Sequence, residues 1–489
     1  MRKLLIIAAL ALRVHGHGQS LQQQLTAIAQ QRGIIGMSVV AACDGQVTDA
    51  VHVGQRSLAQ GLPVNDATRY RIASISKLVT AIGLMRLHEQ GAFQLDADVS
   101  PALGFNLRNP AFPNTAITYR MLLTHRASVQ DGTGYSNFLT ATYSSAPPPP
   151  IQQLLVPGGS SYTANMWRTE APGTYYNYSN VAFGLIGTLI EALSGQRFDQ
   201  YMREQVLLPM GINGSYNVQD LDDIAQLSVL YRNSAPQSDN FNGVMPPAPD
   251  LSGYAIGSNG LFFAPQGGLR CSALELMRVA TMLLNDGTID GTTVLQPATV
   301  QAMLANEWTW NGSNGNNYYG LFRSWGLGVH RITAQAGGDV VFPGTLMYGH
   351  AGEAYGLISD IYFDPQSRFA LVFISNGYTP GNSYALGTSS AFYRVEEDVY
   401  AALASTALAG CLTTGEVPIG AENEYVLTGR SLHWRGRGEL VCDAIDFEGR
   451  LLQQFVIEPG GHWAAADSLG PLLVRGLRTD GSAITVRMN

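Results

Sequence analysis

The pattern of apolar and polar positions predicts sheet-forming segments near both ends of the first 405 residues. Two β-rich runs, 37–43 and 46–53, are separated by Asp44-Gly45, a dipeptide typical of tight hairpins. Strand character returns late in the chain, in the runs 345–350, 358–363 and 369–375. We therefore expect one antiparallel sheet assembled from both ends of this part of the chain.

Helical periodicity dominates the intervening part. Apolar residues recur at helical spacing after Ser74, in a run that ends near Gly91. The other helices that the pattern predicts cover residues 21–31, 118–125, 181–193, 272–284 and 391–407. The expected fold class is therefore α/β, with the sheet flanked by helices and a helical region inserted into it.

The pattern changes after Gly410. Short strand candidates separated by Gly, Pro and Asp turns follow at 425–427, 440–444, 454–457, 472–475 and 484–487. We expect a main domain over residues 19–410 and a small all-β appendage over residues 411–489.

The first 18 residues have the features of a secretory signal. Arg2 and Lys3 precede the apolar run 4–12, which is too short to cross a bilayer. The alternative is a short N-terminal helix. No later stretch reaches the ~20 apolar residues of a membrane helix, so we expect a secreted or periplasmic protein without a membrane span.

Charge and cysteine content restrict the possible partners. The chain has 29 Lys plus Arg against 37 Asp plus Glu, a net charge of −8, which argues against nucleic-acid binding. Its four cysteines allow three pairings, of which Cys411–Cys442 is the most plausible because it would staple the C-terminal region. No two cysteines have metal-ligand spacing, and we expect neither a metal site nor a cofactor.

The strongest chemical signal is Ser74-Ile75-Ser76-Lys77, an S-x-x-K motif at the start of a helix. Residues three apart share one helix face, so Lys77 can reach the Ser74 hydroxyl. All but two of the 29 basic residues are arginine, and the other lysine is Lys3. Only lysine can lose its proton when it is desolvated, so a lysine at this position favours proton transfer with Ser74.

Two further stretches complete a candidate site. Tyr178 and Asn180 lie on a loop that enters an apolar helix, where a tyrosine can relay a proton and an asparagine can bind the lysine and a substrate. The same Y-x-N spacing occurs at Tyr175 and Tyr135, but only Tyr178 has both a Pro-Gly turn before it and a long apolar helix after it.

The second stretch is Gly349-His350-Ala351-Gly352-Glu353, which we place at a strand end. Gly352 would let a substrate approach the strand closely. The N–H of Glu353 could join that of Ser74 in an oxyanion hole. Taken alone, His350 is more often a structural histidine than a catalytic one.

Together, in this order, the three stretches resemble the serine hydrolases related to class C β-lactamases and D-alanyl-D-alanine carboxypeptidases. The resemblance covers roughly residues 36–377 and includes the stretches 117–125 and 267–272. It implies an α/β β-lactamase/transpeptidase-like fold, in which Ser74 is acylated and Lys77 and Tyr178 handle protons. It also implies that Asn180 binds the substrate amide and that His350 is the third-motif residue.

The departures from the family pattern refine this expectation. Class C β-lactamases carry lysine where this chain has His350, which favours an esterase or D-amino-acid peptidase over an efficient β-lactamase. Arg126-Ala127-Ser128 replaces the usual Thr-Ser-Gly and is expected to alter only a local turn. The substrate would be an ester, a peptide or a β-lactam. The alternative is a penicillin-binding or sensing protein that is acylated without turnover, or an inactive relative.

Overall fold

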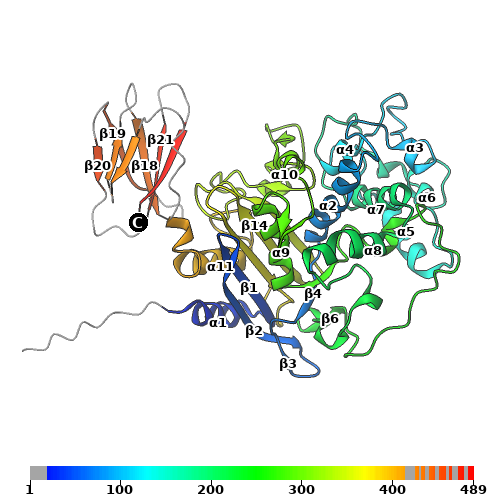
Figure 1. Cartoon of the computed structure of the whole chain (residues 1–489), viewed down its shortest axis with the longest axis horizontal. Helices are drawn as coiled ribbons and strands as arrows, with labels where there is room; N and C mark the ends of the chain where they lie inside the picture. The colour runs from blue at the N-terminus through cyan, green and yellow to red at the C-terminus, as the bar shows by residue number, and fades with distance from the viewer. Residues whose placement is uncertain are drawn as a thin grey trace, which may run out of the picture.

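The computed structural model describes residues 19–413 and the segments 425–428, 431–434, 440–446, 451–458, 462–464, 472–477 and 483–488. The expected secretory signal, residues 1–18, lies outside the described residues. Figure 1 shows a main domain made of a sheet and helices, and a second group of strands near the C-terminus.

A nine-stranded sheet forms the centre of the main domain, in the order β10-β11-β12-β13-β14-β15-β1-β2-β3. Its strands are β1 Gly36–Cys43, β2 Gln46–Ser57, β3 Leu62–Pro63, β10 Trp308–Thr309, β11 Ser324–Trp325, β12 His330–Arg331, β13 Tyr348–Ala354, β14 Leu357–Asp364 and β15 Phe369–Ser375. The early strand β1 pairs antiparallel with the late strand β15, with Met37 opposite Ser375. This pairing confirms that both ends of the main domain build one sheet.

The β1–β2 hairpin follows from its turn residues. Asp44 and Gly45 both have left-handed backbone angles, with φ of 48° and 73°. Two consecutive left-handed residues make the turn whose twist matches that of the flanking strands. The predicted hairpin is therefore confirmed.

Helices cover both faces of the sheet (Figure 1). The helices are α1 Leu21–Arg32, α2 Ile75–Glu89, α3 Ser100–Leu103, α4 Tyr119–Leu123, α5 Thr133–Ser144, α6 Gln152–Leu155, α7 Asn180–Ser194, α8 Phe198–Met202, α9 Ala273–Leu284, α10 Pro297–Leu304 and α11 Arg394–Ser405. Side chains alternate along β1, so Val39 packs in one core with α1 and α11, and Val40 packs in another with α2 and α9. The sheet thus has a hydrophobic core on each side.

The inserted region packs around α2 and α7. In both helices nearly every residue is buried, as expected for helices that are apolar on all sides. The hydroxyl of Ser179 caps the N-terminus of α7, and Gly195, with φ of 69°, ends it. Short strand pairs complete this part of the chain: β4 Arg69–Arg71 with β7 Arg270–Ser272, β5 Leu230–Arg232 with β6 Ala235–Ser238, and β8 Thr288–Ile289 with β9 Thr292–Thr293.

Two local expectations are wrong. The strand expected at 345–350 is β13, Tyr348–Ala354, so Gly349 to Glu353 lies inside the strand instead of at its end. Pairing with β14, in which Gly352 faces Ser359, forms the strand in spite of its low intrinsic propensity. Helix α5 was not expected, because its sequence is rich in Thr, Ser, Gly and Tyr.

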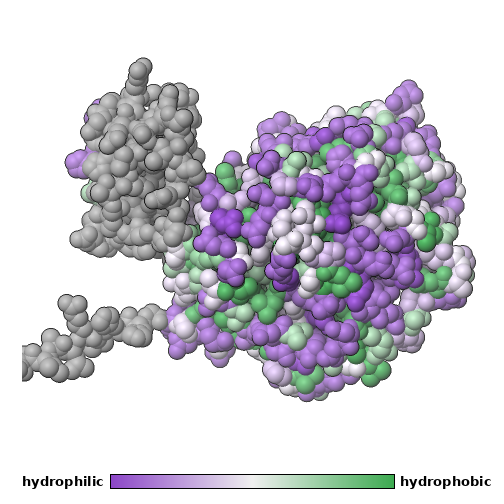
Figure 2. Space-filling view, in the orientation of Figure 1, coloured by the Kyte–Doolittle hydropathy of each residue, from purple (hydrophilic) through white to green (hydrophobic). Residues whose placement is uncertain are grey.

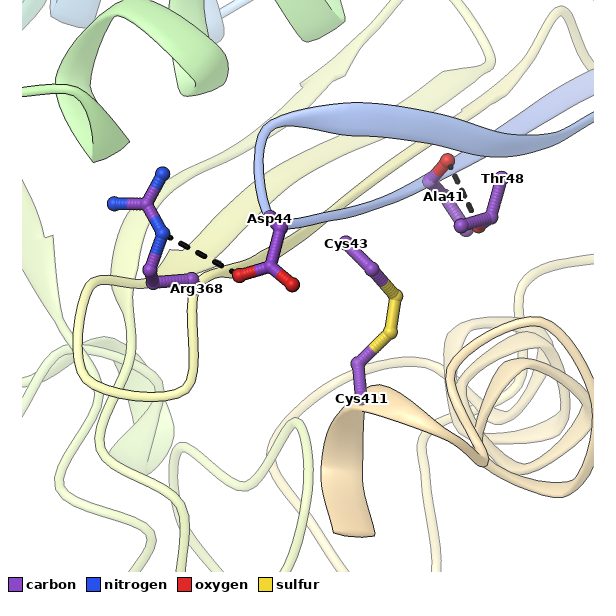
Figure 3. The surroundings of a disulfide bond; sticks show 6 residues. All are labelled: Ala41, Cys43, Asp44, Thr48, Arg368 and Cys411. Atoms are coloured by element: carbon purple, nitrogen blue, oxygen red, sulfur yellow. Dashed lines mark hydrogen bonds and ion pairs between the residues drawn. A yellow bond between two sulfur atoms is a disulfide. The ribbon is translucent and has the colours of Figure 1, made fainter. Parts of the chain in front are cut away.

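The expected Cys411–Cys442 pairing is also wrong. Cys411 lies shortly after α11 and forms a disulfide with Cys43 at the end of β1, with the two Cα atoms 5.9 Å apart (Figure 3). The two cysteines are 368 residues apart in sequence and meet because α11 packs on the sheet that contains β1. The disulfide therefore links the two ends of the main domain and does not staple the C-terminal region.

The C-terminal segment is all-β where it is described. It contains β16 Tyr425–Thr428, β17 Ser431–Trp434, β18 Leu440–Asp446, β19 Leu451–Ile457, β20 His462–Ala464, β21 Leu472–Leu477 and β22 Ala483–Met488. These strands form two antiparallel sheets, β16-β17-β20 and β19-β18-β21-β22. The five expected strands are present, whereas β17 and β20 were not anticipated.

The face of the main domain in Figure 2 is mostly hydrophilic, with hydrophobic residues scattered over it. None of the described helices combines the length and the apolar character that a membrane-spanning helix needs.

We predict that a buried carboxyl makes stability depend on pH. Asp360 of β14 is fully buried, and burial raises its pKa to about 7, with Tyr400 and Glu396 partly opposing the shift. Between about pH 4 and pH 7 the unfolded chain loses this proton while the folded chain keeps it. The contribution of Asp360 to the free energy of unfolding should therefore fall across this range.

Chemical denaturation at a series of pH values checks this prediction. The variant Asp360→Asn cannot ionise at this position, so its unfolding free energy should decline less between pH 4 and pH 7. An identical decline in the wild type and the variant would show that Asp360 is not responsible.

Candidate active site

Ser74 lies at the junction of β4 and α2. It is the residue immediately before the first turn of α2, and Ala73 before it has a φ of 51°. A left-handed alanine is strained, and such strain is often held at functional sites. The turn aligns the Ser74 hydroxyl with the next turn of α2, where Lys77 lies.

Lys77 is completely buried, and its amine makes three hydrogen bonds. The Nζ atom donates to Ser74 Oγ at 3.0 Å, to Asn180 Oδ1 at 2.9 Å and to the backbone oxygen of Gln266 at 2.8 Å. Burial lowers the pKa of Lys77 to about 7, and the negative charge of Asp131 opposes this shift. Near neutral pH the amine therefore exists in both protonation states.

Tyr178 lies against the same amine. Its ring centroid is 4.7 Å from Lys77 Nζ, and the ring stacks on Phe322. Burial raises the pKa of Tyr178, and the neighbouring Ser74 hydroxyl partly opposes the shift. The phenol is therefore protonated at neutral pH. Its buried oxygen makes no hydrogen bond of good geometry with the described residues, so it remains available for another group.

Tyr175 and Tyr135, which share the Y-x-N spacing, have different surroundings. Tyr175 packs under the guanidinium of Arg168. Tyr135 accepts a hydrogen bond from Gln266 Nε2 at 3.3 Å, so it lies near the site without contacting the Lys77 amine. The neighbouring Tyr176, which lacks the spacing, is buried and stacks on Trp308 with ring centroids 4.1 Å apart. The structure thus brings Tyr178, and neither Tyr175 nor Tyr135, next to Lys77.

His350, on β13, faces the same group of residues. It is fully buried, and its ring centroid is 6.0 Å from that of Tyr178. Nδ1 lies 2.5 Å from the backbone oxygen of Ala351, which assigns the proton to Nδ1 and leaves a lone pair on Nε2. Burial lowers the pKa of His350 well below its usual value, and the charge of Lys77 adds to this effect. The imidazole is therefore neutral.

Gly352 allows β13 to pass close to the nucleophile. A Cβ atom at this position would lie 3.2 Å from the Ser74 nitrogen and 2.8 Å from the Ile72 oxygen. Any larger residue would push the strand away from the start of α2. The next residue, Glu353, has an exposed side chain whose carboxylate accepts a hydrogen bond from the Tyr393 hydroxyl at 2.9 Å.

One carboxylate that organises the site was not predicted from the sequence. Asp131 accepts hydrogen bonds from the Ser179 hydroxyl, from the backbone N–H groups of Asn180 and Val181, and from the Asn180 side chain. It thereby caps α7 and fixes the orientation of the amide whose oxygen accepts from Lys77. A motif search misses it because it is a single exposed acid in a loop.

His125 also stabilises the start of α7. Its Nδ1 accepts a hydrogen bond from the Ser179 N–H at 3.1 Å, so it holds the loop that leads into α7. Burial lowers the pKa of His125 well below the usual value, and the nearby Lys77 and His350 lower it further. Of the three basic side chains packed here, only Lys77 is partly charged near neutral pH, because both imidazoles are neutral.

We predict that Lys77 titrates near pH 7. Because the chain has only two lysines, labelling lysine with ¹³C at the ε carbon gives very few signals. One signal should shift with a midpoint near pH 7, and Lys77→Arg should remove it. A Lys77 midpoint near the ordinary value of 10.5 would contradict the proposed desolvation.

The same signal tests the influence of Asp131. Asp131→Asn keeps a hydrogen-bond acceptor of similar shape but removes the negative charge that favours the ammonium. The midpoint of Lys77 should therefore move to lower pH. Asp223→Asn, which changes an exposed acid that accepts from the Ala225 N–H, should leave the midpoint in place. Equal midpoints in Asp131→Asn and the wild type would exclude the electrostatic role.

Comparisons with known proteins agree with this geometry. The family model described as Beta-lactamase matches residues 21–392. Penicillin-binding protein 4 of Amycolatopsis lactamdurans is 22% identical over 377 residues, which cover 74% of this chain and 85% of that protein.

Solved structures share the fold. The D-amino acid amidase of Ochrobactrum anthropi SV3, solved with D-phenylalanine, matches with a TM-score of 0.56 and 18% identity, covering 81% of this chain and 99% of that one. The octameric penicillin-binding protein homologue of Pyrococcus abyssi matches with a TM-score of 0.56 and 19% identity, covering 96% and 89%. Together with the family match over most of its length, this places the chain in the β-lactamase family of serine hydrolases.

Proposed function

We propose that this protein hydrolyses an ester or amide bond through an acyl-enzyme on Ser74. The observation that carries the proposal is the contact between Ser74 Oγ and the buried Lys77 amine at 3.0 Å, combined with a lysine pKa lowered to about 7. A neutral amine at this distance can accept the serine proton, and an ordinary surface lysine cannot at neutral pH.

Acylation begins when Ser74 Oγ attacks the carbonyl carbon and its proton passes to Lys77 Nζ. The carbonyl oxygen becomes negatively charged and is stabilised by the N–H groups of Ser74 and Glu353. Support for this pair is the close approach of Gly352 to the Ser74 nitrogen. Asn180, held by Asp131, keeps the amine aligned during the transfer.

The leaving group then departs with a proton. Tyr178 is protonated and lies against both Lys77 and Ser74, so it passes its proton to the leaving oxygen or nitrogen and regains one from Lys77. In the second half of the reaction a water attacks the ester carbon and gives its proton to the same pair. The acid is released and Ser74 recovers its proton.

His350 influences which substrate this site accepts. A lysine at this position would offer a positive charge to the carboxylate of a β-lactam, whereas the neutral imidazole offers only a lone pair and a ring. We therefore favour an ester or a D-amino-acid amide or peptide over a β-lactam. The similar amidase was solved with a D-amino acid, which fits this choice.

We also propose that the protein acts outside the cytoplasm. The basic and apolar pattern of residues 2–12 supports export. The disulfide between Cys43 and Cys411 suits an oxidising compartment.

Labelling with a fluorophosphonate and hydrolysis of a short-chain nitrophenyl ester test the catalytic proposal. Ser74→Ala should abolish both, because the nucleophile is removed. Lys77→Arg keeps the positive charge but not the proton transfer, and kcat/KM should fall by roughly 10²- to 10⁴-fold. The exposed Ser405→Ala serves as the matched serine control and should behave like the wild type.

Two outcomes separate the alternatives. Ester hydrolysis that persists in Ser74→Ala would contradict the proposal. Labelling of Ser74 without turnover of nitrophenyl esters, D-aminoacyl anilides or a chromogenic β-lactam would instead identify a penicillin-binding or sensing protein.

A further inference from the structure

An arginine without an acidic partner lies close to the candidate active site. Arg71 is the last residue of β4 and stands three positions before Ser74. Its Nε donates to the Gly267 oxygen at 3.2 Å, and its Nη1 reaches the Ser238 hydroxyl at 3.4 Å. Arg71 forms no ion pair within the described part of the chain. Its guanidinium therefore keeps both its charge and donor capacity.

Arg71 and Lys77 are held by neighbouring carbonyl groups. Lys77 donates to the oxygen of Gln266, and Arg71 donates to the oxygen of Gly267. A Cβ atom on Gly267 would lie 3.8 Å from the carbonyl carbon of Ala73, so this loop runs beside the residue that precedes the nucleophile. The guanidinium and the active-site amine thus bind consecutive residues of the same loop.

Tyr355 presents its ring to this guanidinium. The Arg71 Cζ lies 4.9 Å from the ring centroid. Tyr355 is in the turn between β13 and β14 with a φ of 57°, a backbone conformation that is rare for a bulky residue and strained. A tyrosine at a strained turn position normally taken by Gly or Asn suggests that its side chain has a role.

The surrounding charges favour an anion here. Arg232 is exposed, has no ion pair among the described residues, and its Cγ would lie 2.8 Å from a Cβ on Gly356, next to Tyr355. The nearby Asp239 is already paired with Arg270. The carboxylate of Glu353 accepts from Tyr393, at the N-terminus of α11. Two arginines therefore flank the turn, and neither forms an ion pair with an acid of the described residues.

The position of the arginines relates to the orientation of the substrate. His350 lies in the first half of β13, with Tyr178 beside it, and the Tyr355 turn follows the end of the strand, about 13 Å further along from His350. Tyr178 protonates the leaving group in the proposed mechanism, so the leaving group lies toward His350. The acyl group then points toward Tyr355 and Arg71.

We propose that Arg71, stacked on Tyr355 and assisted by Arg232, binds a carboxylate on the acyl portion of the substrate. This inference rests on the proposed function for the location of the acyl group. The preferred substrates are then esters or amides of acids that carry a second carboxylate, such as half-esters of dicarboxylic acids or acidic acyl residues of a peptide. A guanidinium suits this ligand because it donates two parallel hydrogen bonds to a carboxylate.

The experiment compares two nitrophenyl esters that differ only by a terminal carboxylate on the acyl chain, a butyrate and a glutarate half-ester. The wild type should hydrolyse the glutarate ester with the higher kcat/KM. Arg71→Gln should lower the ratio of glutarate to butyrate kcat/KM by about 10- to 100-fold, as expected when a hydrogen-bonded charge is lost. Arg232→Gln should lower it less, because Arg232 is exposed.

Further variants sharpen the comparison. Arg71→Glu should reverse the preference toward an ester with an acyl ammonium group. Arg203→Gln, an arginine of the helical region with a single long hydrogen bond, is the matched control and should keep the wild-type ratio. A wild type without preference, or an Arg71→Gln loss that is equal for both esters, would overturn the proposal.

A binding measurement separates this proposal from the catalytic one. If neither ester is hydrolysed, the mechanism fails, but the glutarate half-ester should still raise the melting temperature of the Ser74→Ala protein more than the butyrate ester does. Arg71→Gln in that background should remove the difference. Equal shifts with the two esters, with Arg71 intact, would exclude the carboxylate site whatever the catalytic result.

Discussion

The burial of a single lysine amine determines the rest of the candidate site. Lys77 is fully enclosed, and removing a charged amine from water is costly unless the charge is reduced or compensated. The protein does both. Three acceptors bind the amine, while burial lowers its pKa to about 7. The proposed chemistry depends on this amine, because in its neutral form it can accept the proton of the Ser74 hydroxyl.

Parts of the fold that are distant in sequence keep this amine dry. Phe183 of α7 lies beneath it, Tyr178 covers it, and the neutral rings of His125 and His350 complete the surroundings. These groups come from the helical region and from β13 of the sheet. Gly352 allows the strand to come close enough to meet α2. The site therefore depends on packing between the sheet and the inserted helices.

Local patterns predicted much of this arrangement. The S-x-x-K spacing predicted that Ser74 lies beside Lys77. The Pro-Gly turn and the apolar helix distinguished Tyr178 from the other tyrosines with Y-x-N spacing. Both predictions were possible because these signals depend on residues that are close in sequence. The Asp44-Gly45 hairpin and the apolar run of α7 were predicted for the same reason. The sheet built from both ends of the domain followed from the distribution of strand patterns along the chain.

What the sequence could not predict depends on tertiary contacts. Asp131 is one exposed acid among 37 acidic residues, and only the folded chain brings it to the N-terminus of α7. Cys43 and Cys411 meet through the packing of α11 on the sheet, which spacing cannot reveal. The limits of β13 are set by its partner β14, and Arg71 gains significance only beside Tyr355.

Proton transfer from Ser74 to Lys77 can be tested by the rate of fluorophosphonate labelling as a function of pH, with the modified residue located by peptide mass spectrometry. We expect an adduct on Ser74 that forms faster as pH rises, with a midpoint near 7 that Lys77→Arg abolishes. An adduct on another residue, or a rate that rises only near the ordinary pKa of lysine, would contradict it.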